Sequence, residues 1–374
     1  MWQAEFSEHL LITFGSVFFL SVVLCTLILA FRKNVLRITS RKDLNSVQST
    51  HTAPTPRIGG VAVVLAIVST LFITAWTPQE RFGTIVYLVT LSPILIAGLF
   101  EDFGMRISPR SRLIAAILAS LMTSLAWGIW VKSINIPVVD VALTFAPLAI
   151  ALTVFGAAGV TNAFNLIDGL NGLTGFYALS TAIALAAIAN QFEIYNLEAA
   201  LMVLFCAVAG FLFFNFPFGK IFLGDGGAYT LGHTLVWIAI AILNRAPDIS
   251  AFAILLVFFW PVADTMLSIW RRRVGGKRTD QPDRLHFHQL VLRFLEIRFF
   301  GRKRRRIANP LATLVVLPCA IAPQIFGVMF ITNDTAAKAS VLVFGLLFVG
   351  SYVFGVRCAG KISARKTSGH ALNL

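Results

Sequence analysis

The chain has 374 residues, of which 57% are hydrophobic and only 13% are charged, and its formal net charge is +14. A soluble domain averages about 25% charged residues, so this composition excludes an ordinary soluble fold, and its many apolar residues exclude intrinsic disorder. A pI of about 10.2 is typical of nucleic-acid-binding proteins, but a mean hydropathy of +0.81 leaves too little water-soluble surface for that class.

Eleven apolar segments are candidates for membrane spans, each of which needs about 20 apolar residues. The first, 10–31, follows two acidic residues instead of a basic stretch and is too long for a cleaved signal peptide. We expect an all-α, polytopic helical bundle that forms a single membrane-embedded domain over residues 1–374. The predicted spans are 10–31, 58–76, 83–100, 112–131, 141–160, 173–190, 198–214, 227–243, 250–270, 311–331 and 338–356.

The distribution of Lys and Arg over the loops predicts the orientation of this bundle. One alternating set of loops holds 27 of the 31 basic residues, and loops rich in Lys and Arg stay in the cytoplasm. We therefore expect the N-terminus outside and the C-terminus inside. The loop 271–310 and the tail 357–374 are the basic cytoplasmic segments that stand out. Much of the positive charge is thus an orientation signal.

Polar residues gather in the loops predicted to be cytoplasmic, whereas the outer loops are short connectors. Transporters usually place polar residues at mid-membrane on broken helices, and here only Asp264 and His233 are strong candidates for such positions. The pattern favours an enzyme that draws a soluble substrate from the cytosol. A multi-pass transporter of an anionic or lipid-linked solute is the alternative.

The first two polar clusters combine backbone constraint with charge. Residues 51–60 begin with His51 and contain two prolines, which favour an extended chain, and two glycines, which permit close approach to a ligand or helix. The second cluster is the acidic pair Glu101 and Asp102. Adjacent acids at a membrane boundary need a cation or a basic partner, and Arg112, with two arginines just before it, is close enough in sequence to supply one.

The third cluster, residues 162–172, places four polar side chains in a stretch without Lys or Arg. In a helical register Asn165 and Asp168 share a face, as do Asp168 and Asn171, and Asn162 lies one turn before them. Oxygen-rich sets of this kind suit Mg²⁺ or a sugar nucleotide. A solvated turn is the alternative.

The fourth cluster, residues 215–227, brackets Asp225 with glycines at the start of a predicted span. Backbone N–H groups at a helix start favour anions, and the carboxylate of Asp225 can hold a metal ion that bridges to phosphates. Lys220 supplies a point charge for a phosphate.

The fifth cluster, residues 282–289, contains Arg284, His286 and His288 within the long basic loop. Residues two apart on a regular helix point in different directions, so the two histidines are not expected to chelate one metal from a helix. We predict that they are paired phosphate donors in an irregular turn. A purely electrostatic surface loop is the alternative.

Together the five clusters carry, in order, a PxPRxGG loop, an acidic pair, and close forms of NAxNxxDGxDGL, FNxxPxKxFxGDxGS and HxHH. In this the chain resembles the polyprenyl-phosphate N-acetylhexosamine-1-phosphate transferases, the WecA/MraY-type family, across roughly residues 43–290. Its HxH form is nearer the WecA branch. The resemblance implies transfer of a sugar-1-phosphate from a UDP-sugar to undecaprenyl or another polyprenyl phosphate, with release of UMP.

The resemblance also implies a setting and a cofactor. This step initiates a cell-surface polysaccharide, requires Mg²⁺ (or Mn²⁺ in its place), and takes place at the cytoplasmic face of the bacterial inner membrane. The partners are the UDP-sugar, the lipid phosphate and the membrane, with a homodimer as a further possibility and no nucleic acid.

Roles for individual residues follow from the same resemblance. Asp225 matches the metal-binding aspartate, Glu101 and Asp102 match the pair that binds metal or activates the lipid phosphate, and Asp168 matches a nucleophile or base. A single in-line step and a covalent route through Asp168 both remain open. Asn162, Asn165 and Asn171 match nucleotide-side positions, and His51, Lys220, Arg284, His286 and His288 match phosphate-handling positions.

The sequence also departs from the family pattern at several positions. Glu101 replaces the usual Asp, Asn171 replaces the second Asp of the DGxDG motif, Gln289 replaces a His and Ala228 replaces a Ser. An amide at position 171 still pairs with a uracil edge but removes a charge. These departures bear on the choice of sugar more than on the class of reaction.

Overall fold

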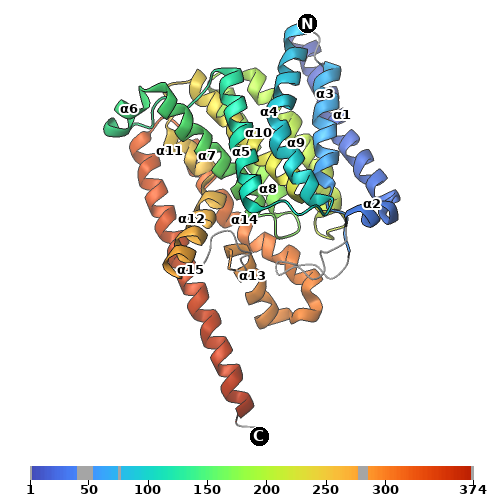
Figure 1. Ribbon diagram of the computed structural model, residues 1–374, viewed down its shortest axis with the longest axis vertical. Helices are drawn as coiled ribbons and strands as arrows, with labels where there is room; N and C mark the ends of the chain where they lie inside the picture. The colour runs from blue at the N-terminus through green and yellow to red at the C-terminus, as the bar shows by residue number, and fades with distance from the viewer. Residues whose placement is uncertain (1, 40–53, 75–76, 277–284, 372–374) are drawn as a thin grey trace.

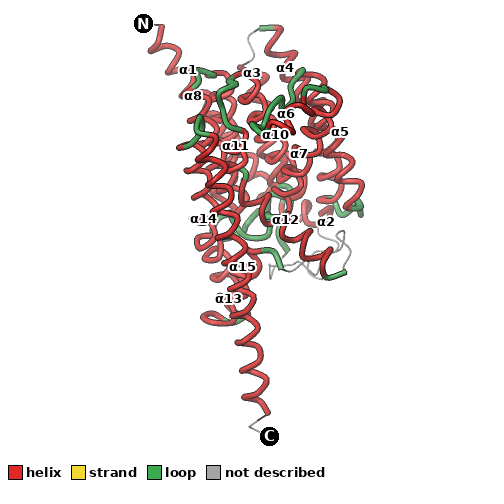
Figure 2. The backbone as a smooth tube through the Cα atoms, turned by 90° about the vertical axis from the view of Figure 1, so that its left-hand side faces the viewer, coloured by secondary structure: helices red, strands yellow, loops and turns green. Residues whose placement is uncertain are grey.

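The computed structural model describes residues 2–39, 54–74, 77–276 and 285–371, and these residues form helices and loops without a strand (Figure 2). The predicted all-α class is therefore confirmed for this part of the chain. A π-helical turn (Glu296–Phe300) and a 3-10 turn (Arg302–Arg304) join α13 to α14. The α-helices are α1 (Trp2–Ala30), α2 (Arg32–Thr39), α3 (Gly59–Thr74), α4 (Pro78–Asp102), α5 (Pro109–Trp127), α6 (Pro137–Leu143), α7 (Ala146–Leu166), α8 (Leu173–Gln191), α9 (Tyr195–Asn215), α10 (Gly224–Arg245), α11 (Ala251–Val257), α12 (Phe259–Val274), α13 (Phe287–Leu295), α14 (Arg305–Met329) and α15 (Asp334–Ala371).

Each of the eleven predicted spans coincides with a helix, or with the pair α11 and α12. Among the described residues, eight helices are long and apolar enough to cross a membrane, and the bent pair raises the number to nine. Helix α3 is shorter, with 16 residues, and α5 begins with two arginines in its first turn. The chain is thus a multi-pass membrane protein, while the count of eleven spans stays a prediction.

The predicted span 250–270 is a broken one, because α11 and α12 meet at an angle of 83°. Pro261 explains where the break falls. A proline lacks the N–H that a helix needs, and its ring clashes with the carbonyl four residues earlier. That carbonyl belongs to Val257, the last residue of α11.

Helix α10 forms the centre of the bundle. In its apolar window 78% of the residues are buried, against 17% in the corresponding windows of α1 and α15. It packs against α3, α4 and α7. A Cβ atom on Gly98 of α4 would stand 2.5 Å from the Cα of Gly226, and one on Gly60 of α3 would stand 2.5 Å from the amide nitrogen of Gly227. Glycines therefore bring both helices into backbone contact with the first turn of α10.

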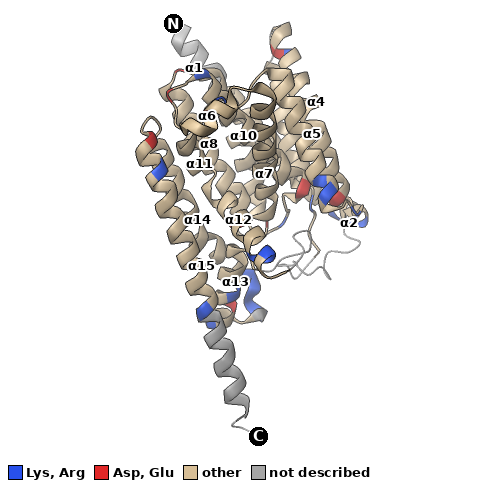
Figure 3. Cartoon of the chain, turned by 60° about the vertical axis from the view of Figure 1, so that its left-hand side comes forward, with Lys and Arg blue, Asp and Glu red and all other residues tan. Residues whose placement is uncertain are grey.

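Most basic residues gather at one end of the bundle. The start of α1 and the end of α15 lie at opposite ends of the molecule (Figure 1), and most described Lys and Arg lie toward the α15 end, near α2, α5 and α13 (Figure 3). The loops predicted to be cytoplasmic therefore share one end. The short helix α6 lies at the other end, on the far side of the bundle from the start of α1 (Figure 1). Which end faces the cytoplasm stays a prediction.

Candidate active site

Asp102, the last residue of α4, binds the start of α10. Its side chain is buried, its Oδ1 accepts the N–H of Asp225 at 2.8 Å, and its Oδ2 accepts the N–H of Gly226 at 2.9 Å. The first N–H groups of a helix have no partner inside that helix, so Asp102 caps α10 from a different helix. Gly224 leaves room for this contact, because a Cβ atom there would lie 2.6 Å from Asp102 Oδ2, and its φ is +80°.

Two arginines bind the carboxylate of Asp225. Arg112 Nη1 lies 2.5 Å from Asp225 Oδ2, and Arg57 Nη2 lies 3.5 Å from Oδ1. Arg112 belongs to the first turn of α5, and Arg57 precedes α3. Each arginine compensates the negative charge that Asp225 and Asp102 place close together. We call these four residues the acidic centre.

Backbone hydrogen bonds fix Arg57 beside this centre. The N–H of Phe222 donates to the carbonyl of Pro56 at 2.8 Å, and the N–H of Gly59 donates back to the carbonyl of Phe222 at 2.9 Å. The segment before α3 therefore lies along the segment before α10. The first, second and fourth predicted clusters come together here.

Glu101, the other member of the acidic pair, lies differently from Asp102. It is half-buried, and its Oε2 accepts the N–H of Ile107 at 2.9 Å. Glu101 therefore stabilises the turn between α4 and α5. The arginine that reaches the acids is Arg112, as the sequence allowed, but its hydrogen-bond partner is Asp225.

Asp168 lies in the turn between α7 and α8, half-buried. Burial raises the pKa of its carboxyl group to about 7, although the positive charge of Arg57 opposes this shift. A carboxyl group with a pKa near the working pH is suited to accept or donate a proton. Asn162 and Asn165 precede it in the last turns of α7, where the Asn162 side chain donates to the carbonyl of Ala158 at 2.8 Å.

Asparagine side chains connect this turn to the other loops. Asn215 Oδ1 accepts the N–H of Gly172 at 2.6 Å, while its Nδ2 donates to the carbonyl of Ile221 at 2.7 Å. Asn171 Nδ2 donates to the carbonyl of Pro217 at 2.9 Å, and Asn309 Oδ1 accepts the backbone N–H of Asn171 at 2.8 Å. The third cluster is therefore held against the fourth and against the start of α14.

The fifth cluster reaches the same turn through its histidines. His286 precedes α13 with an extended backbone, and His288 lies in the first turn of this helix. Their rings stack with centroids 5.8 Å apart and planes 13° apart. A Cβ atom on Gly169 would overlap His288 Nε2 and stand 3.0 Å from its Cδ2, so the His288 ring lies against the turn of Asp168. His286 and His288 are the histidine pair.

Burial governs the charge of the histidine pair. His288 is fully buried, and burial lowers the pKa of its imidazole to about 4. It is therefore neutral at neutral pH. His286 Nδ1 lies 2.9 Å from Asp264 Oδ2, so Asp264, singled out in the sequence as a buried acid, has a histidine as its partner.

Sequence reasoning missed several residues of this site. Arg57 was part of a recognised motif but was not assigned a role, and Arg112 was predicted as a partner of the acidic pair but not of Asp225. Asn215 also lay inside a cluster, whereas Asn309 lay in none and carried no signal. His51 and Arg284, both predicted to handle phosphates, lie outside the described residues.

A cavity of about 830 Å³ opens beside this site, between the end of α1, the loop before α10 and the start of α14. Its wall contains Arg32, Lys220, Arg305 and Arg306 together with Asn171 and apolar side chains. Lys220 is exposed, with its Nζ 5.6 Å from the ring centroid of Phe218. The cavity thus combines positive charge, an amide and aromatic rings.

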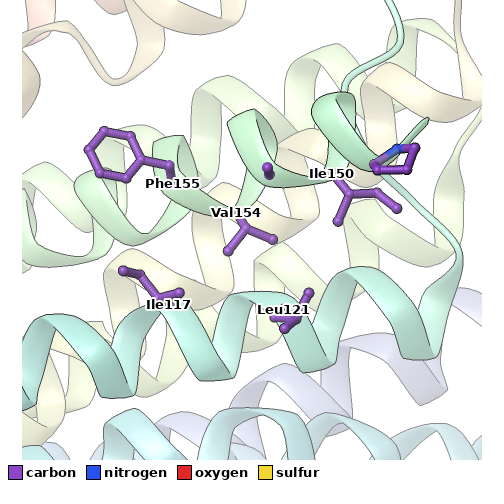
Figure 4. Close-up of a pocket in the computed structure, with 7 residues that line it drawn as sticks. Ile117, Leu121, Ile150, Val154 and Phe155 are labelled. Atoms are coloured by element: carbon purple, nitrogen blue, oxygen red, sulfur yellow. The ribbon is translucent and has the colours of Figure 1, made fainter. Parts of the chain in front are cut away.

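A second hollow, of about 500 Å³, lies between α5 and α7 (Figure 4). Its wall is apolar, with Ile117 and Leu121 from α5 facing Ile150 and Val154 from α7. Both helices are among the predicted spans. This hollow offers no polar chemistry and is not part of the candidate site.

Fold and site together define a multi-pass helical membrane protein with carboxylates, arginines and histidines gathered at one end. Comparison with known proteins then identifies the family. The glycosyl transferase family 4 model matches residues 84–243. The chain is 30% identical to a decaprenyl-phosphate N-acetylglucosaminephosphotransferase of Mycobacterium tuberculosis, over 77% of this chain and 76% of that protein. The chain therefore belongs to glycosyl transferase family 4, and the resemblance inferred from the five motifs is confirmed.

Two further relatives agree with this assignment. The chain is 26% identical to a probable undecaprenyl-phosphate N-acetylglucosaminyl 1-phosphate transferase of Bacillus subtilis, over 74% of this chain and 76% of that protein. It is 24% identical to the undecaprenyl-phosphate alpha-N-acetylglucosaminyl 1-phosphate transferase of Escherichia coli, over 72% and 73%. The alternative of a transporter finds no support in these comparisons.

Proposed function

We propose that this protein transfers N-acetylhexosamine-1-phosphate from a UDP-sugar to undecaprenyl or another polyprenyl phosphate, and releases UMP. The observation that carries the proposal is the meeting of Asp102, Asp168 and Asp225 with Arg57 and the histidine pair at one end of a membrane bundle. The relatives named for this reaction give the chemistry of donor and acceptor.

The reaction needs charge neutralisation more than a strong base. An oxygen of the lipid phosphate attacks the β-phosphorus of the donor, and the bond from this phosphorus to the bridging oxygen breaks as UMP leaves. Both substrates are anions, so their approach is repulsive. Arg57 and Arg112 lower this repulsion and stabilise the charge that develops on the leaving UMP. Asp168, with a pKa of about 7, can accept the last proton of the lipid phosphate.

Within the acidic centre, we propose that Asp225 binds a magnesium ion that is shared with the substrate. The described residues contain no group of three or more His, Cys, Asp or Glu side chains that could hold a metal. Mg²⁺ is commonly bound by one or two carboxylates together with substrate phosphates, and the carboxylate of Asp225 suits that arrangement. Bound there, Mg²⁺ or Mn²⁺ would neutralise the diphosphate of the donor.

Asp102 differs from Asp225 in its partners: the oxygens of Asp225 face the side chains of two arginines, whereas Asp102 binds backbone groups. Both of its oxygens accept N–H groups of α10, which supports a role in fixing the position of Asp225. Direct coordination of the metal by Asp102 stays a prediction.

The cavity beside Asn171 suits the nucleotide part of the donor. Its volume of about 830 Å³ lies within the range of small-molecule sites. Lys220 and the arginines of its wall can bind phosphate oxygens, the aromatic rings can stack on a base, and Asn171 can pair with a uracil edge. We place the donor's nucleotide there.

The proposal also covers the membrane in which the enzyme lies and the face that carries its site. The excess of Lys and Arg at the end that carries the site supports a site at the cytoplasmic face, and the bacterial relatives support the inner membrane. A homodimer stays a prediction.

The proposal is tested by the release of UMP from UDP-N-acetylglucosamine in the presence of undecaprenyl phosphate and Mg²⁺. The purified variant Asp225→Asn should lose activity by about 100-fold or more, because the carboxylate charge is needed at the site of reaction. Asp248→Asn, which removes an exposed carboxylate between α10 and α11, is the matched control and should keep full activity. Full activity of Asp225→Asn would exclude Asp225 from the site.

A second arm tests the choice of substrate. A panel of UDP-N-acetyl sugars should contain one that the wild-type protein consumes. Consumption of a different nucleotide sugar alone would overturn the substrate part of the proposal. Solute flux in liposomes without UMP formation would favour a transporter.

A further inference from the structure

A buried carboxylate of α12 binds the start of α13. The side chain of Asp264 is 2% exposed, which is costly for a charged group unless its oxygens have partners. Both oxygens have one: Oδ2 lies 2.9 Å from His286 Nδ1, and Oδ1 accepts the backbone N–H of Phe287 at 3.0 Å. Asp264 therefore binds two consecutive residues at the point where α13 begins.

The bend between α11 and α12 gives Asp264 this position. Helix α12 begins at Phe259, and Asp264 lies about one and a half turns into it. Around this contact, the ring of Phe287 packs edge-on against Trp260 of α12, with centroids 4.9 Å apart, and lies 5.3 Å from Phe348 of α15. The aromatic contacts anchor α13 independently of the charge on Asp264.

The hydrogen bond to Asp264 also selects a tautomer of His286. A carboxylate accepts but does not donate, so neutral His286 carries its hydrogen on Nδ1 and presents Nε2 as an acceptor, and not as the phosphate donor that the sequence predicted. The His286 ring stacks on His288, which lies against Gly169 beside Asp168. Neither nitrogen of His288 has a hydrogen-bond partner among the described residues. Asp264 is thus the fixed end of a chain of contacts that leads to the turn of Asp168.

We propose that Asp264 is a positioning residue of the transferase: it holds His286 in the Nδ1–H tautomer and the start of α13 in place, so that the histidine pair faces the substrate phosphates beside Asp168. The inference rests on the proposed function for its substrate and on the contacts of Asp264, His286 and His288 for its geometry. Histidines that bind metal ions are commonly held in this way by a carboxylate behind them, and the same geometry is present here.

The variant Asp264→Asn tests this inference with little change of shape. An asparagine oxygen can still accept the N–H of Phe287, but its amide then donates to Nδ1 and favours the opposite tautomer of His286, in which Nε2 carries the hydrogen and no longer accepts one. We expect kcat for UMP release to fall by about 10- to 100-fold, while KM for the UDP-sugar stays within about threefold. Asp264→Glu should recover part of the loss.

Two controls separate positioning from folding. Asp140→Asn alters a carboxylate that accepts the N–H of Ile134 at 2.8 Å elsewhere in the chain, and its kcat should stay at the wild-type value. In a His286→Gln background, Asp264→Asn should cause little further loss, because the residue through which it acts is gone. An unchanged kcat in Asp264→Asn, or a full additional loss in the His286→Gln background, would overturn the inference.

A spectroscopic arm keeps the inference separate from the proposed reaction. The chain contains 6 histidines, so ¹⁵N-histidine NMR of the detergent-solubilised protein can follow His286, assigned by His286→Gln. We expect the Nδ1–H tautomer in the wild-type protein and the Nε2–H tautomer in Asp264→Asn. The same tautomer in both proteins would overturn the inference even if UMP release is confirmed. A protein that shows the expected change of tautomer but releases no UMP would refute the proposed function alone.

Discussion

The acidic centre and the histidine pair are held in place by different physical means. Asp225 is positioned through its own backbone N–H, which Asp102 binds, and its carboxylate is neutralised by Arg57 and Arg112. His288 has no hydrogen bond at either ring nitrogen among the described residues, and only packing and the stacked His286 fix it. The acidic centre is therefore formed before substrate arrives, whereas the histidine pair depends on a carboxylate behind it. The following predictions test this difference.

The largest effect is expected at Asp102. Asp102→Asn replaces one accepting oxygen by an amide that faces the N–H of Asp225 or Gly226. This unmatched donor should lower the free energy of unfolding by about 1–3 kcal/mol and reduce UMP release by about 100-fold, since Asp225 shifts with α10. Thermal unfolding in detergent and the UMP assay measure the two effects.

Glu101→Gln is the matched control for Asp102. A glutamine oxygen still accepts the N–H of Ile107, so we expect a stability loss below about 1 kcal/mol and less than a tenfold loss of activity. Equal losses in the two variants would show that the acidic pair acts as a unit, against the division of roles described above.

The second largest effect concerns the glycines beneath the acidic centre. Gly98→Ala places a methyl group 2.5 Å from the Cα of Gly226, where only backbone can move, and should cost about 1–3 kcal/mol of stability. Gly83→Ala in the same helix meets only Trp127 at 3.5 Å, an ordinary contact, and should be neutral or slightly stabilising. Similar unfolding temperatures for the two variants would contradict the close packing of α4 on α10.

Asp168 gives a prediction about pH. Its carboxyl group keeps its proton up to a pH of about 7 in the folded chain and up to about pH 4 in the unfolded chain. Between these values the folded state binds more protons, so the contribution of Asp168 to stability falls as the pH rises from about 4 to 7. In Asp168→Asn this part of the pH dependence of the unfolding temperature should be absent. An unchanged profile would show that the group titrates as it does in the unfolded chain.

The smallest effect is expected at Lys220. Because this side chain is exposed, Lys220→Gln should raise KM for the UDP-sugar about three- to tenfold, in line with the modest value of exposed charges, and leave kcat nearly unchanged. Steady-state kinetics with each substrate varied in turn measure this. A rise in KM for the lipid phosphate alone would place the acceptor in the cavity.

The sequence predicted the parts of the site that lie in short motifs. Asp225 between glycines, Asp168 among asparagines and the two histidines could be recognised because the required chemistry falls within a few residues. Hydropathy located the helices that carry the two aspartates, but not α13, whose first turn holds His288 where an irregular turn was predicted. The pairing of Arg57 with Asp225 could not be predicted, because 168 positions separate the two residues and only the packing of α3 on α10 joins them. Asn309 was missed for the same reason.

The bend at Pro261 could be predicted from the sequence only in part. The proline was visible in the sequence, but proline is tolerated inside other helices of this chain, such as α4 at Pro93. Only the surrounding packing decides whether a helix breaks at a proline. The position of Asp264 beside α13, and with it the tautomer of His286, depends on that break.

The contact of Asp102 with α10 has a consequence for the biogenesis of the protein. During synthesis α4 leaves the ribosome before residues 225 and 226 have been made. At that stage Asp102 lacks the N–H groups that bind it in the folded protein. The insertion of α10 supplies these groups, because the N–H groups of Asp225 and Gly226 are the ones that Asp102 accepts. The charged residues of the acidic centre therefore come together only when the central helix has been inserted, although α4 and α10 are made at different times.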